Sequence, residues 1–196
     1  MAYNFASVKV LVVDDNAPMV KLAKSLLMVF GVKEIMTARN GEEGFRICCE
    51  KEPDIVIADW MMEGVDGITM ARRIRNNPKS LNPYVPIILM TGFSEQRRVE
   101  DARDAGVTEF LVKPFNARDL YRRIAQIVEK PRQFVRTESF FGPDRRRKAN
   151  PHYNGVERRK ARTSQREEEK VHALRKFSEV LRQADPDDVA NQGKSS

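Results

Sequence analysis

A short apolar run that ends in a carboxylate, Ile55-Val56-Ile57-Ala58-Asp59, most constrains what this chain can fold into. A β-branched, uncharged run of this length is typical of a parallel strand that is buried on both faces. In open sheets of that kind, ligands bind beyond the carboxyl ends of the strands. Asp59 is therefore expected at the edge where such folds carry out their chemistry.

Three further apolar runs end in polar residues in the same way. They cover residues 8–13, 87–90 and 107–112, and they lead into Asp14-Asp15, Thr91 and Lys113 respectively. Because parallel strands end at a common edge, we expect three carboxylates, one hydroxyl and one ammonium to converge there. For any one of these residues alone, a strand-end side chain that merely faces solvent is the better interpretation. Four strand ends in agreement favour a site.

The predicted cluster carries the ligands of a divalent cation. Three carboxylates without a cation would repel one another and raise one another's pKa. The candidate ligands Asp14, Asp15 and Asp59 are all oxygen donors, with no histidine or cysteine at ligand spacing, so Mg2+ fits best. Lys113 adds a positive charge that suits a phosphoryl group. The combination predicts phosphoryl transfer onto Asp59 to give an aspartyl phosphate.

The chain resembles the receiver domain of two-component response regulators, of the chemotaxis-regulator type. The resemblance rests on Asp14-Asp15, the Asp-x-x-Met-x-x-x-Asp-Gly pattern from Asp59 to Gly67, Thr91-Gly92, Phe110 and Lys113-Pro114. It covers about residues 5 to 130, and the motifs are highly specific as a set. One departure is visible at Glu63, because the family usually has proline after the methionine.

The resemblance implies a role for each residue of the acidic cluster. Asp59 would be the phosphoacceptor, and it would ligate Mg2+ together with Asp15. Asp14 would orient the ion, often through water, and the backbone carbonyl of Met61 would complete the protein ligands. The phosphoryl group would come from a histidine kinase or a histidine phosphotransfer protein.

Thr91 and Lys113 would stabilise the new phosphoryl group, by the same resemblance. Thr91 and Phe110 would then form the switch, with the aromatic ring moving inward as the threonine shifts toward phosphate. A core Phe110 that never moves is the alternative. The Lys113–Pro114 peptide bond is cis in the family, and X-Pro bonds tolerate the cis form far better than other peptide bonds do.

The lifetime of the aspartyl phosphate is expected to depend on two neighbouring positions. In receivers, the residues two after the phosphoacceptor and two after the threonine border the path of the hydrolytic water. Here these residues are Met61 and Phe93, whose side chains cannot hydrogen-bond a water strongly. We therefore expect a comparatively long-lived phospho-Asp59.

Five predicted strands alternate with five predicted helices over residues 1–130. The strands lie at 8–13, 34–38, 55–58, 87–90 and 107–112, and the helices begin near Asn16, Asn40, Asp66, Ser94 and Asn116. This alternation indicates a doubly wound α/β fold with a five-stranded parallel sheet. We expect the flavodoxin-like strand order 2-1-3-4-5, which places strands one and three side by side.

The composition changes after residue 130. Residues 1–130 carry a net charge of +1, whereas residues 131–196 carry +6. We predict a receiver domain at 1–130 and a basic, flexible linker at 131–164. An amphipathic helix at 165–184 and a disordered tail at 185–196 would follow.

The basic linker contains the pattern Gly-x-acid-Arg-Arg twice. The copies begin at Gly142 and Gly155, thirteen residues apart, and each follows closely on an aromatic residue, Phe141 or Tyr153. A phosphorylation-gated regulator that binds nucleic acid through these arginines is the alternative function. A solvated, disordered linker, or a linker that docks back onto the receiver, is the favoured interpretation of the same residues.

Several partners and a location follow from these predictions. We expect a downstream protein target, and the stripe of the terminal helix could be buried on the receiver, on a second copy in a homodimer, or on another protein. No run approaches the roughly 20 apolar residues of a membrane span, and no signal peptide is visible, so a cytoplasmic protein is expected. We expect no enzymatic activity beyond self-phosphorylation from a phosphodonor and autodephosphorylation.

Overall fold

A computed structural model describes residues 3–92, 99–137 and 140–144 of the chain. Four predicted features lie outside these residues: the helix at 165–184, the tail at 185–196, the second copy of the Gly-x-acid-Arg-Arg pattern, and Phe93. The strands of the main sheet are Lys9–Val13 (β1), Glu34–Ala38 (β2), Ile55–Asp59 (β3), Ile87–Thr91 (β4) and Glu109–Val112 (β5). The helices are Ala17–Val29 (α1), Gly41–Lys51 (α2), Gly67–Asn76 (α3), Val99–Asp104 (α4) and Ala117–Glu129 (α5).

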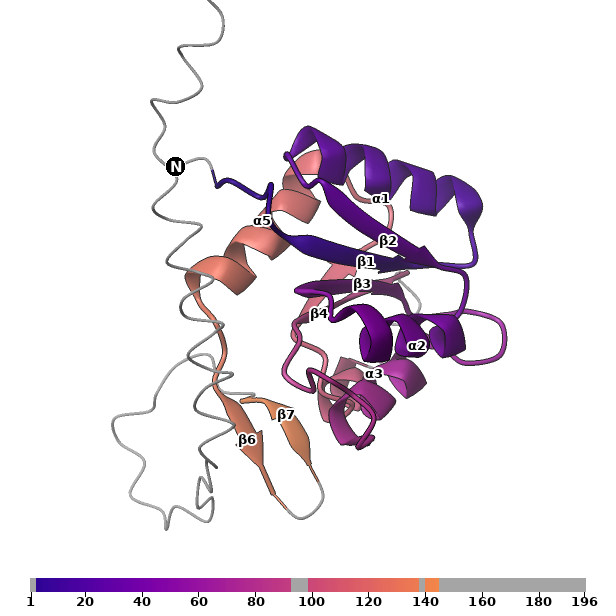
Figure 1. The fold of residues 1–196 in the computed structure, drawn as a ribbon, viewed down its shortest axis with the longest axis vertical. Coiled ribbons are helices and arrows are strands. Elements are labelled where there is room, and N and C mark those ends of the chain that lie inside the picture. The colour runs from indigo at the N-terminus through magenta and orange to yellow at the C-terminus, as the bar shows by residue number, and fades with distance from the viewer. Residues whose placement is uncertain (1–2, 93–98, 138–139, 145–196) are drawn as a thin grey trace, which may run out of the picture.

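The five strands form a parallel sheet in the order β2-β1-β3-β4-β5, which confirms the predicted doubly wound α/β fold. Helices cover both faces of the sheet (Figure 1). One apolar cluster packs α2 and α3 against the sheet, through residues such as Phe45 and Met70. A second cluster packs α1 and α5 against the opposite face, through residues such as Leu27 and Ile124. No helix in the described part of the chain is long and apolar enough to cross a membrane.

Polar side chains begin four of the helices where the sequence predicted them to begin. The capping residues are Asn16, Asn40, Asp66 and Asn116, and each side chain accepts a hydrogen bond from the backbone N–H three residues later. These bonds satisfy donors that have no partner within the helix. The caps therefore fix where each loop at the carboxyl edge of the sheet gives way to a helix.

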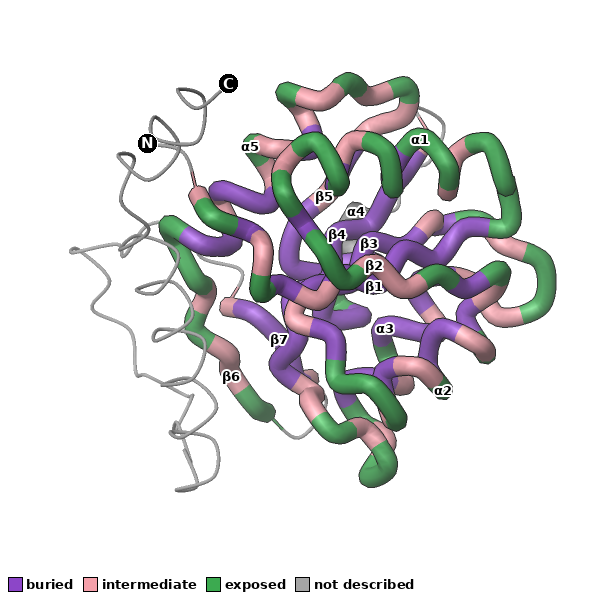
Figure 2. The backbone as a smooth tube through the Cα atoms, turned by 45° about the horizontal axis from the view of Figure 1, so that its top comes forward, coloured by how far each residue is buried: buried purple, intermediate pink, exposed green. Residues whose placement is uncertain are grey.

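Two short strands, Phe134–Arg136 (β6) and Phe141–Pro143 (β7), form an antiparallel hairpin beyond α5. We predicted no strand there and placed residues 131–164 in a basic, flexible linker, with docking back onto the receiver as one interpretation of it. Strands of three residues are too short to show an alternating pattern, and they form here because they pack on the body of the protein. Figure 2 shows β7 buried, with β6 on its outer side.

Aromatic residues and one buried arginine dock the hairpin. The Tyr84 ring lies 5.2 Å from Phe134 and 5.1 Å from Phe141, measured between ring centroids. Arg75 of α3 is 2% exposed and lies over the Phe134 ring, while its guanidinium donates hydrogen bonds to the carbonyls of Gly106 and Pro83. Burial lowers the pKa of Arg75 to about 9, which leaves it charged at neutral pH.

An ion pair also joins β5 to the segment that enters the hairpin. Glu109 on β5 is 2% exposed, and its carboxylate lies 3.3 Å from Arg132 and 3.6 Å from Arg123. A buried carboxylate is strongly destabilising when its cationic partner is removed. The segment that enters the hairpin is therefore held to the sheet by charge, while the hairpin itself is held by aromatic packing on Tyr84 and Arg75.

We expect Phe141→Ala to lower the free energy of unfolding of the full chain by about 3 to 5 kcal/mol, because it removes a buried ring from this cluster. Urea unfolding followed by the fluorescence of Trp60, which is 2% exposed in the body of the protein, measures the change. Gln133→Ala, at an exposed position of the same segment, is the control. A loss below about 0.5 kcal/mol for Phe141→Ala would show that the hairpin adds nothing to the stability of the core.

Candidate functional site

The site residues that the sequence placed at strand ends come together at the carboxyl edge of the sheet. Val13 pairs with Ala58 in the register of β1 and β3, so the next residues, Asp14 and Asp59, lie at neighbouring strand ends. Thr91 is the last residue of β4, and Lys113 directly follows β5. The strand ends that carry these residues therefore meet at one edge of the sheet, as predicted.

The ammonium of Lys113 joins two of the carboxylates. Its Nζ lies 3.0 Å from Oδ2 of Asp14 and 2.8 Å from Oδ1 of Asp59. The Asp14 side chain is completely buried, and that of Asp59 is 13% exposed. The backbone N–H of Lys113 donates to the carbonyl of Thr91, which fixes the start of the lysine side chain against β4. The Lys113–Pro114 peptide bond is cis.

Backbone N–H groups hold each of the three carboxylates. The donors are Asn16 to Asp14 at 2.8 Å, Trp60 to Asp59 at 2.9 Å, and Glu63 to Asp15 at 3.1 Å. All three donors belong to the loops that follow β1 and β3. The loop backbones therefore orient the acidic side chains.

The pKa values show how far the charges compensate one another. Burial raises the pKa of Asp59, and the charge of Asp14 raises it further, while the hydrogen bond and charge of Lys113 act in the opposite direction. For Lys113, burial alone would lower the pKa, but the hydrogen bonds and charges of Asp59 and Asp14 outweigh burial and raise it. One ammonium therefore leaves the acidic cluster with uncompensated negative charge.

The donor set fits a hard divalent cation. Carboxylate oxygens of Asp14, Asp15 and Asp59 lie within 4.8 Å of one another. Oxygen ligands in small number suit Mg2+, which keeps several of its waters, and the exposed Asp15 leaves one side of the cluster open to solvent. A bound Mg2+ would neutralise the carboxylates and polarise phosphoryl oxygens.

The other predicted residues belong to the same sheet and its loops. Thr91 is 2% exposed, and its hydroxyl donates to the carbonyl of Gly92 at 3.1 Å. Phe110 pairs in register with Leu89 of β4 and packs, half-buried, against the apolar cluster of α2 and α3. Met61, two residues after Asp59, is 55% exposed.

Gly67 has a structural role that we did not predict. A Cβ atom on this residue would lie 2.1 Å from the carbonyl oxygen of Asp59, so no other residue fits without a shift of the backbone. Its N–H donates to the carbonyl of Trp60. The Asp-Gly pair at the end of the motif was the signal available in the sequence. The absence of a side chain at Gly67 allows α3 to begin directly against the end of β3.

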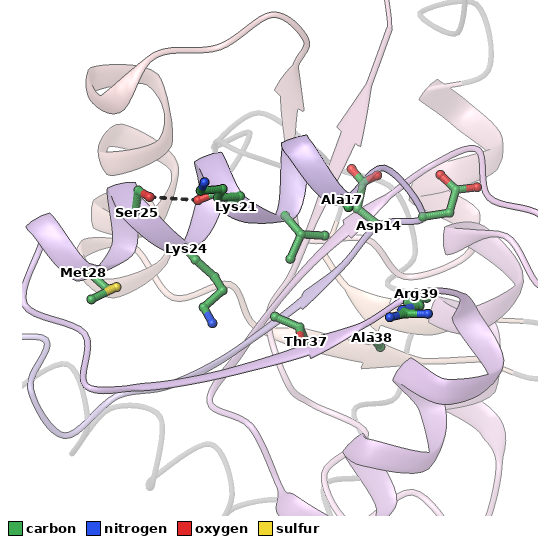
Figure 3. Close-up of a pocket in the computed structure, with 11 residues that line it drawn as sticks. Asp14, Ala17, Lys21, Lys24, Ser25, Met28, Thr37, Ala38 and Arg39 are labelled. Carbon is green, nitrogen blue, oxygen red and sulfur yellow. Dashed lines mark hydrogen bonds between the residues drawn. The ribbon is translucent and has the colours of Figure 1, made fainter.

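A groove of about 760 Å³ extends from the acidic cluster between α1 and the edge strand β2. Asp14, Asp15, Lys21, Lys24 and Arg39 are among the residues that line the groove. Asp14 and Arg39 lie toward one end of it, and Lys24 lies further along (Figure 3). The site is therefore open along α1 as well as toward the loops.

Comparisons with known proteins agree with this architecture. The family model of the response regulator receiver domain matches residues 10–125. The phosphate regulon transcriptional regulatory protein PhoB of Pseudomonas aeruginosa is 28% identical, over 62% of this chain and 52% of PhoB. The chemotaxis protein CheY-3 of Vibrio cholerae is 29% identical, over 63% of this chain and 94% of CheY-3. The chain thus spans about half the length of PhoB.

Solved structures with the same fold include a response regulator from Chloroflexus aurantiacus. It is 28% identical with a TM-score of 0.58, over 63% of this chain and 98% of that one. Another is the receiver domain of a sensor histidine kinase from Pseudomonas aeruginosa, with a magnesium ion coordinated in its active site cleft. It is 27% identical with a TM-score of 0.54, over 61% of this chain and 94% of that one.

The family match ends within α5, so the β6–β7 hairpin lies beyond it. Except for Lys9, the matched part carries all five strands of the sheet and the cluster at its carboxyl edge. Receiver domains are signalling modules of two-component systems rather than classical enzymes. Through residues 10–125, this chain belongs to the response regulator receiver domain family.

Proposed function

We propose that Asp59 accepts a phosphoryl group from a histidine kinase or a histidine phosphotransfer protein, and that the modified domain signals through contact with a downstream protein. The observation that carries the proposal is the position of Lys113, within 3.0 Å of both Asp14 and Asp59 at the edge where the strands end. A carboxylate nucleophile needs such a cation beside it to approach an anionic phosphoryl group.

The transfer would proceed by direct attack of Asp59 on phosphorus. As the bond between the carboxylate oxygen and phosphorus forms, the phosphorus–nitrogen bond of the phosphohistidine breaks. Its electron pair stays on the imidazole, which then takes a proton from solvent. Lys113, 2.8 Å from the attacking carboxylate, would follow the charge onto the phosphoryl oxygens, and the Thr91 hydroxyl would donate to them in place of Gly92.

Mg2+ is the cofactor that we propose for this site. Asp14, Asp15 and Asp59 would hold it, together with the backbone carbonyl of Met61. The oxygen-only donor set supports this assignment, as does the magnesium ion in the cleft of the similar Pseudomonas aeruginosa receiver domain.

We also propose a location, a second candidate function and an oligomeric state. A cytoplasmic location suits a protein that meets a kinase domain in the cytoplasm. Binding of nucleic acid by the basic residues after 130 is the second candidate function, and the net charge of +6 on residues 131–196 favours it. A homodimer through residues 165–184 is an additional proposal.

We expect acetyl phosphate with Mg2+ to add one phosphoryl group to the wild-type protein and none to Asp59→Asn, because the substitution removes the nucleophile. Intact-protein mass spectrometry measures the modification. Asp101→Asn, at an exposed position of α4, is the matched control and should be modified as the wild type is. Full modification of Asp59→Asn would contradict the assignment of Asp59.

The double substitution Met61→Asn and Phe93→Glu should shorten the lifetime of phospho-Asp59. The new polar groups could orient the attacking water, and positioning of the nucleophile is a large share of the catalysis available in phosphoryl transfer. The decay of purified phosphoprotein with Mg2+ present measures the lifetime. If the double variant decays as the wild type does, Met61 and Phe93 do not control hydrolysis.

A further inference from the structure

Asp15 is held differently from the other two acids of the cluster. Asp14 and Asp59 share the ammonium of Lys113, and each also accepts a backbone N–H. Among the described residues, the hydrogen bond that Asp15 accepts comes from the backbone N–H of Glu63, at 3.1 Å, and Asp15 forms no ion pair. The orientation of the most exposed ligand therefore depends on one backbone donor.

Glu63, whose N–H is this donor, stands at the position where the chain departs from the usual receiver pattern. Proline is common there, and proline has no backbone N–H. Glu63 supplies one, and its bond to Asp15 joins the loop after β3 to the loop after β1. The departure, which removes no catalytic group, thus adds a contact inside the site.

We propose that Glu63 is a positioning residue for the magnesium site, and that its backbone N–H holds the Asp15 carboxylate toward Asp14 and Asp59 before the cation binds. The inference rests on the proposed function. Three carboxylates with oxygens within 4.8 Å repel one another, and an exposed side chain can turn into solvent to relieve that repulsion. A fixed N–H opposes this rotation, so the Asp15 side chain loses less conformational freedom when the cation binds.

The proposal assigns the role to the backbone and not to the Glu63 carboxylate, which separates two kinds of substitution. Glu63→Ala and Glu63→Gln keep the N–H and remove the negative charge. Glu63→Pro removes the N–H. A role for the side-chain charge would therefore appear in all three variants, whereas a role for the N–H would appear in Glu63→Pro alone.

Titration of the full chain with Mg2+ alone, followed by Trp60 fluorescence, tests the proposal. Trp60 is the single tryptophan of the chain, and it directly follows Asp59, whose carboxylate accepts the backbone N–H of Trp60, so its fluorescence reports on the cluster without any phosphodonor. We expect Glu63→Pro to weaken Mg2+ binding roughly three- to tenfold, the range for loss of one ordinary hydrogen bond. Glu63→Ala and Glu63→Gln should bind Mg2+ within about twofold of the wild type.

Proline also restricts the loop, so a second measurement leaves Glu63 in place. In the protein freed of Mg2+, we expect Asp15→Ala to speed the hydrogen exchange of the Glu63 amide roughly threefold or more. The Gly67 amide, which is bonded to Trp60, is the internal control and should exchange as in the wild type. An unchanged Glu63 amide would overturn the proposal, as would wild-type Mg2+ affinity in Glu63→Pro or equal losses in all three variants. A wild-type protein that does not bind Mg2+ would instead overturn the magnesium site and this inference with it.

Discussion

The contact of one ammonium, Lys113, with the carboxylates of Asp14 and Asp59 is the interaction on which the site depends. Asp14 is completely buried, and a buried carboxylate without a cation is strongly destabilising. Lys113 follows β5, and β4 lies between β5 and β3, so the ion pairs tie the edge of the sheet to its centre. At the other end of the same four-residue strand, Glu109 binds Arg132 and anchors the segment that leads to the hairpin.

Local signals in the sequence predicted most of the fold. The buried runs of β1, β3 and β4 contain almost no polar residues, and the caps at Asn16, Asn40, Asp66 and Asn116 depend only on residues nearby in the chain. The hairpin could not be predicted in this way. It depends on Tyr84 and Arg75, which lie far from it in the sequence, and on the close approach of Gly142 to the Cα of Gly106.

The site likewise has features that local sequence patterns predict and features that they do not. Strand ends place Asp14, Asp59, Thr91 and Lys113 together because sheet topology determines where parallel strands end, and this much could be predicted. The backbone donors of Asn16, Trp60 and Glu63 depend on loop conformations that no pattern in the sequence encodes. The steric demand at Gly67 likewise depends on how closely α3 begins against the end of β3, which the sequence pattern does not specify.

The titration of the Lys113 ammonium, followed by NMR in the protein freed of Mg2+, tests the central claim most directly. If Lys113 is paired with Asp14 and Asp59, its pKa lies above the ordinary value of 10.5 and is lower in Asp59→Asn than in the wild type. A wild-type pKa at or below 10.5, unchanged by Asp59→Asn, would show that burial outweighs the ion pairs and that Lys113 does not hold the cluster together.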